Sequence, residues 1–101
     1  MIYGIYSIRD FKTGFLSPTV DVNDFAAVRN FEHAVLNSEQ SLFFSHPEDY
    51  ALYRIGSIDT DTGVITPLTP VAEMITATQV FGSALSQKLK GSGNNGSEET
   101  V

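Results

Sequence analysis

Residues 7–18 read SIRDFKTGFLSP and residues 57–67 read SIDTDTGVITP, so one short pattern occurs twice in a chain of 101 residues. In both copies Ser-Ile is followed by an Asp, a Thr-Gly step, two apolar residues, a small hydroxyl residue and Pro. Asp favours turns and Gly takes a positive φ without steric cost, so each copy predicts the turn of a β-hairpin. Chance recurrence of Thr-Gly turns would also explain so short a repeat, and the prediction of hairpins stands in either case.

The segments that lead into these turns alternate in the manner of strands. In residues 2–10, one predicted face carries Tyr3, Ile5, Ser7 and Arg9, and the other carries Ile2, Gly4, Tyr6 and Ile8. In residues 50–58, one face carries Ala51, Tyr53, Ile55 and Ser57, and the other carries Leu52, Arg54, Gly56 and Ile58. Phe15 and Leu16 begin the first return strand. Because Pro18 cannot donate to a ladder, this strand is predicted to be short or to lie at an edge.

Two helices are predicted after the hairpins. The first ends near Asn37, is capped by Asp21 or Asn23, and has an apolar stripe of Phe25, Ala27, Val28, Phe31, Ala34 and Val35. The second opens at Thr69-Pro70, with Pro at its first position, and runs to about Lys88. In the connector between the hairpins we expect a short strand over Leu42–Phe44. A helical turn then follows at Pro47, where Ser45 and Glu48 have capping-box spacing.

These elements predict an α+β fold, a two-layer sandwich in which an antiparallel sheet of two β-hairpins is covered by two helices, with the β-β-α unit used twice. The length fits one domain, which we place at residues 1–90. Residues 91–101, GSGNNGSEETV, contain no apolar residue before Val101, so we predict a disordered Gly/Ser/Asn-rich tail.

Composition limits the classes of function. The chain has no Cys, which excludes disulfides and thiolate metal sites and fits a reducing compartment. It has no apolar run of the roughly 18 to 20 residues that a membrane span needs and no signal peptide, so we predict a soluble protein without a membrane partner. Its net charge is −6, and an acidic chain starts with a handicap for binding phosphates.

No motif in the sequence indicates a catalytic activity. No G-x-S-x-G elbow occurs, and no spacing ties His33 or His46 to a nucleophile. His46 with Glu48 and Asp49 could be drawn as a metal or acid/base cluster, although capping explains this segment without a ligand. The DTDTG turn at residues 59–63 resembles the start of a calcium loop, but Pro70 stands where the twelfth-position Glu is required. We therefore predict no catalytic residue, no metal and no cofactor.

The predicted sheet carries aromatic and basic side chains that could bind a partner. A sheet face that carries aromatic rings and Arg side chains can hold single-stranded nucleic acid by stacking. The candidate nucleic-acid residues are Arg9, Lys12, Arg29, Tyr53 and Arg54. An uncovered face rich in Tyr and Ile would also suit self-association. The candidate residues of a homo-oligomer interface are Tyr3, Ile5, Tyr53 and Ile55.

The order of several motifs resembles a known family. IYSIRD, the pattern formed by Asn23, Asp24, Ala27, Arg29 and Phe31, the run HPEDYALYRIG and the D-x-x-TG turn are similar to the small nonstructural protein of gokushovirus-type microviruses, which are single-stranded DNA phages. The similarity spans about residues 2–66, and HPEDY-x-L-x-x-IG is its distinctive part. The resemblance implies an early protein that is absent from the virion and located in the cytoplasm of the bacterial host.

The resemblance also implies a role where replication changes toward making and packaging single-stranded genomes. Our leading hypothesis is a non-enzymatic phage protein that binds single-stranded DNA weakly, as an oligomer that doubles its basic and aromatic sites. The alternative is an adaptor that binds a replication initiator or a host factor and never touches DNA.

Overall fold

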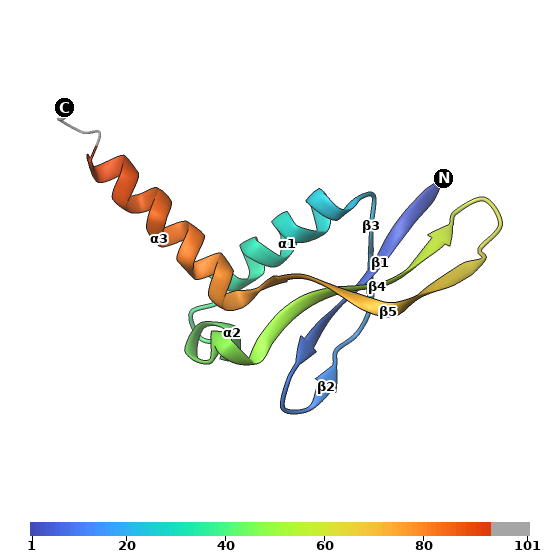
Figure 1. The fold of residues 1–101 in the computed structure, drawn as a ribbon, viewed down its shortest axis with the longest axis horizontal. Coiled ribbons are helices and arrows are strands. Elements are labelled where there is room, and N and C mark those ends of the chain that lie inside the picture. The colour runs from blue at the N-terminus through green and yellow to red at the C-terminus, as the bar shows by residue number, and fades with distance from the viewer. Residues whose placement is uncertain (94–101) are drawn as a thin grey trace.

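The computed structural model describes residues 1–93, which form a curled antiparallel sheet with helices on one of its faces (Figure 1). The elements in chain order are β1 (Ile2–Asp10), β2 (Gly14–Phe15), β3 (Thr19–Asp21), α1 (Asp24–Leu36), α2 (Leu42–Ser45), the short 3-10 helix η1 (Pro47–Asp49), β4 (Tyr50–Asp59), β5 (Ile65–Thr76) and α3 (Ala77–Gly93). The α+β class and the antiparallel sheet are confirmed. The described residues contain a five-stranded sheet and three α-helices, where the sequence predicted a four-stranded sheet, a further short strand in the connector and two helices.

The sheet is organised around β1 and β4, which pair with each other along almost their whole length. The strand order is β2-β1-β4-β5, and β3 pairs with the first half of β1 on the edge that β2 also occupies. Both predicted turns are present, and Gly14 and Gly63 have φ of 117° and 77°, the left-handed values that Gly accepts without steric cost. The repeated sequence therefore does encode two hairpins.

Proline interrupts both edges of the sheet. On one edge, Pro18 lies between β2 and β3, so the return strand of the first hairpin is split into segments of two and three residues. On the other edge, β5 contains Pro67 and Pro70, and its register with β4 shifts between the pairs Arg54–Ala72 and Gly56–Pro67. The Thr69-Pro70 peptide bond is cis. Since Pro has no N–H to donate, edge strands are where a sheet accommodates it.

Helix α1 matches its prediction closely. Asn23 is the N-cap, and its side chain accepts a hydrogen bond of 2.8 Å from the backbone N–H of Ala26. Ala27, Phe31 and Val35 are buried against the sheet, as their spacing predicted. Phe25 was wrongly assigned to this stripe. It lies in the first turn, roughly 100° around the helix from the buried stripe, and its side chain is 87 % exposed.

The connector before β4 is helical rather than extended. Leu42–Ser45 form α2, so the predicted short strand over Leu42–Phe44 is wrong. The reason is tertiary: Phe43 packs edge-on against Phe31 and Tyr50, and Phe44 packs against Phe81 of α3. A short helix directs these two neighbouring rings toward different partners. The predicted helical turn at Pro47 is present as η1, but no side chain caps it, so the capping role given to Ser45 is wrong.

The second long helix begins seven residues later than predicted. Residues 70–76 continue β5, in which Ala72, Glu73 and Ile75 pair with Arg54, Tyr53 and Leu52 of β4. Helix α3 starts at a capping box, where Thr76 Oγ1 accepts from the N–H of Gln79 at 3.0 Å and Gln79 Oε1 accepts from the N–H of Thr76 at 2.9 Å. The Thr-x-x-Gln pattern at residues 76–79 was the local signal for this start, and it outweighs the Thr-Pro step at residue 70.

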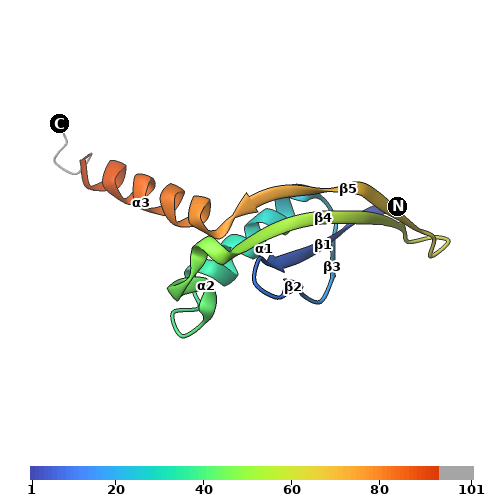
Figure 2. The same cartoon turned by 60° about the horizontal axis from the view of Figure 1, so that its bottom comes forward.

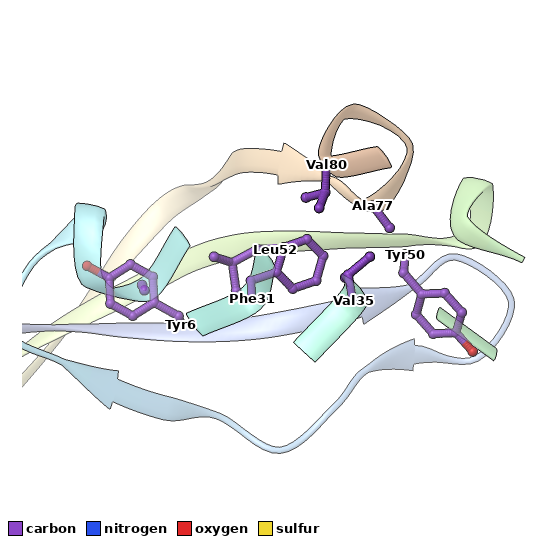
Figure 3. Close-up of a cluster of buried hydrophobic side chains, with 8 residues drawn as sticks. Tyr6, Phe31, Val35, Tyr50, Leu52, Ala77 and Val80 are labelled. Atoms are coloured by element: carbon purple, nitrogen blue, oxygen red, sulfur yellow. The ribbon is translucent and has the colours of Figure 1, made fainter. Parts of the chain in front are cut away.

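The hydrophobic core lies between the sheet and the helices. Figure 3 shows Tyr6, Tyr50 and Leu52 from the sheet beside Phe31 and Val35 from α1, with Ala77 and Val80 from the start of α3. Tyr6 also covers Gly4, because a Cβ atom built at residue 4 would collide with the Tyr6 ring. The sheet face toward α1 is therefore closed by packing.

The molecule is elongated, with extents of 55 × 32 × 23 Å, because α3 continues away from the body after its first turns (Figures 1 and 2). The tail was predicted to start at residue 91, but α3 includes residues 91–93. The rest of the predicted tail, residues 94–101, lies outside the described residues.

Candidate nucleic-acid interface

The sheet distributes the five predicted nucleic-acid residues over different parts of the molecule. Arg9 and Tyr53 lie together on the sheet face that α1 leaves uncovered, since their neighbours Ile8 and Arg54 lie on the face toward α1. Arg54 is paired with α1. Arg29 is exposed on α1 itself, and Lys12 lies in the turn between β1 and β2. The structure thus brings two of the five residues into one site.

The site on the uncovered face is a cluster of Arg9, Phe11, Phe15 and Tyr53, which we call the Arg9 cluster. The Arg9 guanidinium carbon lies 4.9, 5.5 and 5.8 Å from the ring centroids of Phe11, Phe15 and Tyr53. These distances are those of cation–π contacts. Phe15 packs edge-on against Tyr53 with a centroid distance of 5.4 Å. One cation is therefore held among three rings.

The hairpin register builds the Arg9 cluster. Arg9 pairs with Phe15 across β1 and β2 and with Ala51 across β1 and β4, and the small Ala51 side chain leaves space around the guanidinium. Tyr53 pairs with Ser7, whose hydroxyl donates to the carbonyl oxygen of Leu16 at 2.6 Å. Large and small residues therefore alternate around Arg9, and the rings of Phe15 and Tyr53 lie close to its guanidinium.

The rings of the Arg9 cluster differ in their access to solvent. Phe11 and Phe15 are 44 % and 46 % exposed, so each offers part of a ring face. Tyr53 is only 9 % exposed, and its hydroxyl donates to Glu73 of β5 at 3.4 Å. A ligand on this face would therefore meet the two phenylalanines and Arg9 first. The carboxylate of Glu73 repels phosphate on the β5 side of the cluster.

Phe11 and Phe15 are the site residues that sequence reasoning missed. The signal for Phe15 was available in the hairpin prediction, because a turn over residues 10–14 places residue 15 opposite residue 9. Counting outward from the turn is enough to put Phe15 beside Arg9. Phe11 carries no such signal, since its position depends on the turn conformation.

Arg54 is engaged on the opposite face, in a network that closes the gap between the sheet and α1. Its Nη1 donates to Asp24 Oδ1 at 2.7 Å, and the hydroxyl of Tyr6 donates to the same oxygen at 2.5 Å. Burial, together with the hydrogen bond to the Asp24 carboxylate, raises the pKa of Tyr6 to about 12. Arg54 therefore joins the sheet to α1 on the face opposite Arg9, and a contact between Arg54 and nucleic acid remains a prediction.

Lys12 faces acidic neighbours rather than Arg9. It lines a hollow of about 640 Å³ together with Asp10, Glu48 and Asp49. The backbone N–H of Lys12 donates to Asp10 Oδ1 at 2.9 Å, and this bond lowers the pKa of the Asp10 carboxyl. Burial, reinforced by Asp10, raises the pKa of the Tyr50 hydroxyl on the same side. The Arg9 cluster is thus left with one cation.

A second surface feature lies where α1 begins. A hollow of about 250 Å³ is lined by both apolar and charged groups, namely Ile2, Gly4, Val22, Asn23, Asp24, Phe25 and Arg54. Phe25 stands at its rim with 87 % of its surface exposed, and Ile2 and Val22 are more than half exposed. The lining of this hollow therefore combines exposed apolar side chains with the Arg54–Asp24 ion pair.

The predicted oligomer interface is partly available on the uncovered face. Tyr3 and Ile5 are half-buried and share the face of Arg9, whereas Tyr53 is buried beneath Phe15. Ile55 is a β-bulge residue, since β1 pairs with Gly56 and Arg54 on either side of it. The interface through these four residues remains a prediction.

Three further observations concern other chemistry. Ser45 Oγ lies 2.9 Å from His46 Nδ1, a contact between exposed neighbours at the end of α2. Within the described residues, no group of three or more His, Asp and Glu side chains is placed to hold a metal ion. None of the helices in residues 1–93 combines the length and the apolar character needed to cross a bilayer.

Comparison with known proteins identifies a family. Residues 3–80 match the model of a family described as Phage ORF5 protein. The matched region includes β1 from its second residue, the other four described strands, α1, α2, η1 and the capped first turn of α3. No curated protein and no solved structure matches the chain.

Proposed function

We propose a function for this chain from the premise that it belongs to the phage ORF5 protein family. It is a non-enzymatic protein that contacts single-stranded DNA weakly through the Arg9 cluster, at the stage where the phage replicates and packages its genome. The observation that carries this proposal is the set of three rings within 4.9 to 5.8 Å of the Arg9 guanidinium on the uncovered sheet face. The packaging stage comes from the resemblance to microviral nonstructural proteins.

The chemistry of the Arg9 cluster suits a flexible single strand. Bases can stack on exposed aromatic side chains, and each such stack contributes about 1 to 3 kcal/mol. Phe11 and Phe15 offer such surfaces, and Arg9 between them can contact a phosphate or a base plane. Stacking does not depend on sequence, so binding would be general rather than sequence-specific.

Affinity should be low because cations are scarce on this face. Each phosphate neutralised on a single strand contributes about −0.7 to the slope of log K against log salt concentration. Each chain offers one arginine in the Arg9 cluster. We therefore expect a slope near −0.7 for a single chain and near −1.4 for two chains bound together. A DNA-binding protein with a basic groove would show a steeper slope.

The test is fluorescence anisotropy of a labelled single-stranded oligonucleotide titrated with the protein at two salt concentrations. Arg9→Ala and Phe15→Ala should each weaken binding by about fivefold or more, since one removes the cation and the other a stacking surface. Arg29→Ala is the matched control. It removes the same charge from an exposed position on α1 and should leave affinity within about twofold.

Two results would count against the proposal. Equal weakening by Arg29→Ala and Arg9→Ala would indicate a general charge effect rather than a site. Absence of any signal at high micromolar protein and low salt would rule out the contact with DNA.

The second candidate is an adaptor that binds a replication initiator or a host protein. The observation in its favour is the hollow rimmed by Ile2, Val22 and Phe25, where an apolar side chain is 87 % exposed beside the Arg54–Asp24 pair. Under this alternative, Phe25→Ala would reduce recovery of the phage initiator with the protein from infected cells, whereas Phe15→Ala would not. The reverse pattern would favour the Arg9 cluster.

A further inference from the structure

Helix α3 has two apolar faces, and the body of the molecule uses one of them. Ala77 and Val80 are buried, and Phe81 packs against the body. Leu85 and Leu89 lie on a different stripe, centred roughly 140° around the helix from the first. Their side chains are 59 % and 64 % exposed, on the part of α3 that extends away from the sheet (Figure 1).

Small residues lie beside these leucines on the same stripe. Gly82 and Ser86 are exposed and line an open hollow of about 580 Å³, together with Met74, Ile75, Gln79 and Ser83, at the junction of β5 and α3. A Cβ atom built at Gly82 meets nothing within 4 Å. The stripe therefore combines two ridges, Leu85 and Leu89, with two gaps, Gly82 and Ser86.

We propose that a second copy of this chain covers this stripe, so that two α3 helices pack antiparallel. When Leu89 of one copy lies opposite Gly82 of the other, Leu85 then lies opposite Ser86. Both large residues meet small ones in this register. A parallel pair would instead set Leu against Leu and Gly against Gly. The self-complementary spacing is what selects a second copy as the partner.

Two further observations agree with the antiparallel arrangement. In this register the end of the partner helix lies over the hollow beside Gly82, so Leu89 enters existing space. The sequence of residues 77–93 contains Lys88 and Lys90 and no acidic residue, so a parallel pair would bring like charges to the same level. The macrodipoles of two antiparallel helices also oppose each other favourably.

Association would supply contacts that the projecting part of α3 lacks in a single chain. Isolated helices shorter than about 12 to 15 residues are marginal in water. The part of α3 beyond Ala84 packs little against its own body, and a partner helix would supply the missing contacts. This proposal does not depend on DNA binding, and its test contains no DNA.

The first experiment is sedimentation equilibrium of the full chain and its variants. The wild type should show twice the chain mass of 11.0 kDa. Leu89→Glu should raise the dissociation constant by about 30-fold or more, and Gly82→Leu by about tenfold or more because it fills the gap. Gln87→Glu adds the same charge to an exposed position outside the stripe and should leave the dimer intact.

Gly82→Leu keeps the test independent of folding. A Cβ atom at residue 82 meets no atom within 4 Å, the position is exposed, and replacing Gly inside a helix raises helix propensity, so the circular dichroism of α3 should not decrease. A wild type that remains monomeric at high micromolar concentration would overturn the proposal. A Leu89→Glu dimer as tight as the wild type would overturn it too.

The second experiment tests the direction of the helices by oxidation of single-Cys variants, since the chain has no Cys of its own. In the proposed register the two copies of residue 86 are offset by about 1.5 Å along the helix axis, and the two copies of residue 78 by about 22 Å. Ser86→Cys should therefore form a disulfide-linked dimer and Thr78→Cys should not. Cross-linking of both variants would indicate a parallel pair and refute the register.

Discussion

The two faces of the sheet are made by the same three strands, β1, β4 and β5, and they differ in what lies over them. On the face toward α1, Tyr6 and Leu52 are 0 % and 4 % exposed and join the core of the molecule. On the other face, Arg9 is held by rings of which Phe11 and Phe15 are nearly half exposed. A shift of one residue along a strand thus decides whether an aromatic side chain stabilises the fold or remains available to a ligand.

The largest difference in stability is expected when a phenylalanine is replaced by alanine on each face of the sheet. Phe31→Ala should lower the free energy of unfolding by about 3 to 5 kcal/mol, because it leaves a cavity in the core. Phe15→Ala should cost about 1 kcal/mol, because its ring keeps half of its surface in water. Urea denaturation of both variants measures the contrast, and equal losses would contradict the assignment of the two faces.

The second test uses the raised pKa of Tyr6, which belongs to the covered face. Its ordinary pKa is near 10 and its pKa in the fold is about 12, so the folded state retains this proton more firmly than the unfolded state. The contribution of Tyr6 to the free energy of unfolding is therefore fully present below pH 10. It should fall by about 2 to 3 kcal/mol between pH 10 and pH 12.

Denaturation at a series of alkaline pH values reveals this loss. Tyr6→Phe should show a smaller decrease over the same range, because it has no hydroxyl to ionise. Tyr3→Phe, a half-exposed control on the uncovered face, should behave as the wild type does. Parallel curves for wild type and Tyr6→Phe would mean that the network with Asp24 does not control this titration.

The third test concerns the start of α3, which contributes Ala77 and Val80 to the covered face. Thr76→Ala removes one half of the capping box and should cost about 1 kcal/mol. Thr78→Ala, two residues later and exposed, is the matched control and should be nearly neutral. Thermal unfolding followed by circular dichroism measures both. A loss as large for Thr78 would show that the helix does not begin at Thr76.

The smallest effect is expected at the centre of the uncovered face. Arg9→Ala should lower stability by less than about 1 kcal/mol, since partly exposed cation–π contacts contribute about that much. Arg54→Ala, which leaves Asp24 without its ion pair at the junction with α1, should cost more. Chemical denaturation of the two variants would sharpen the contrast between the arginine of the uncovered face and the arginine paired with α1.

Local signals predicted much of the fold. Turn residues and alternation identified both hairpins, the two faces of β1 and the faces of β4 from Ala51 to Arg54, and Asn23 with the spacing of Ala27, Phe31 and Val35 identified α1. Beyond Arg54 the predicted faces of β4 are wrong, because the bulge at Ile55 places Gly56 and Ile58 on the face of Tyr3 and Ile5, and Ser57 on the face of Gly4. The errors arose where tertiary contacts decide. Leu42–Ser45 is helical because two rings must reach different partners, and residues 70–76 are extended because β4 offers them a ladder.

The candidate site was less predictable than the fold. Alternation placed Arg9 and Tyr53 on one face, yet nothing local announces that Arg54 is paired with Asp24, thirty positions earlier in the chain. The same is true of Lys12, which borders the acidic residues of η1. The sequence prediction treated the basic residues as one binding surface, but the folded chain places them on different faces and elements.

The prolines at the two sheet edges have a consequence for behaviour at high concentration. An open row of N–H and C=O groups can recruit the strand of another molecule and propagate into fibrils. Here Pro18 breaks one margin, and Pro67 and Pro70 break the other. Neither side offers a long uninterrupted template, so this small β-rich protein should resist amyloid growth even when it accumulates to high levels.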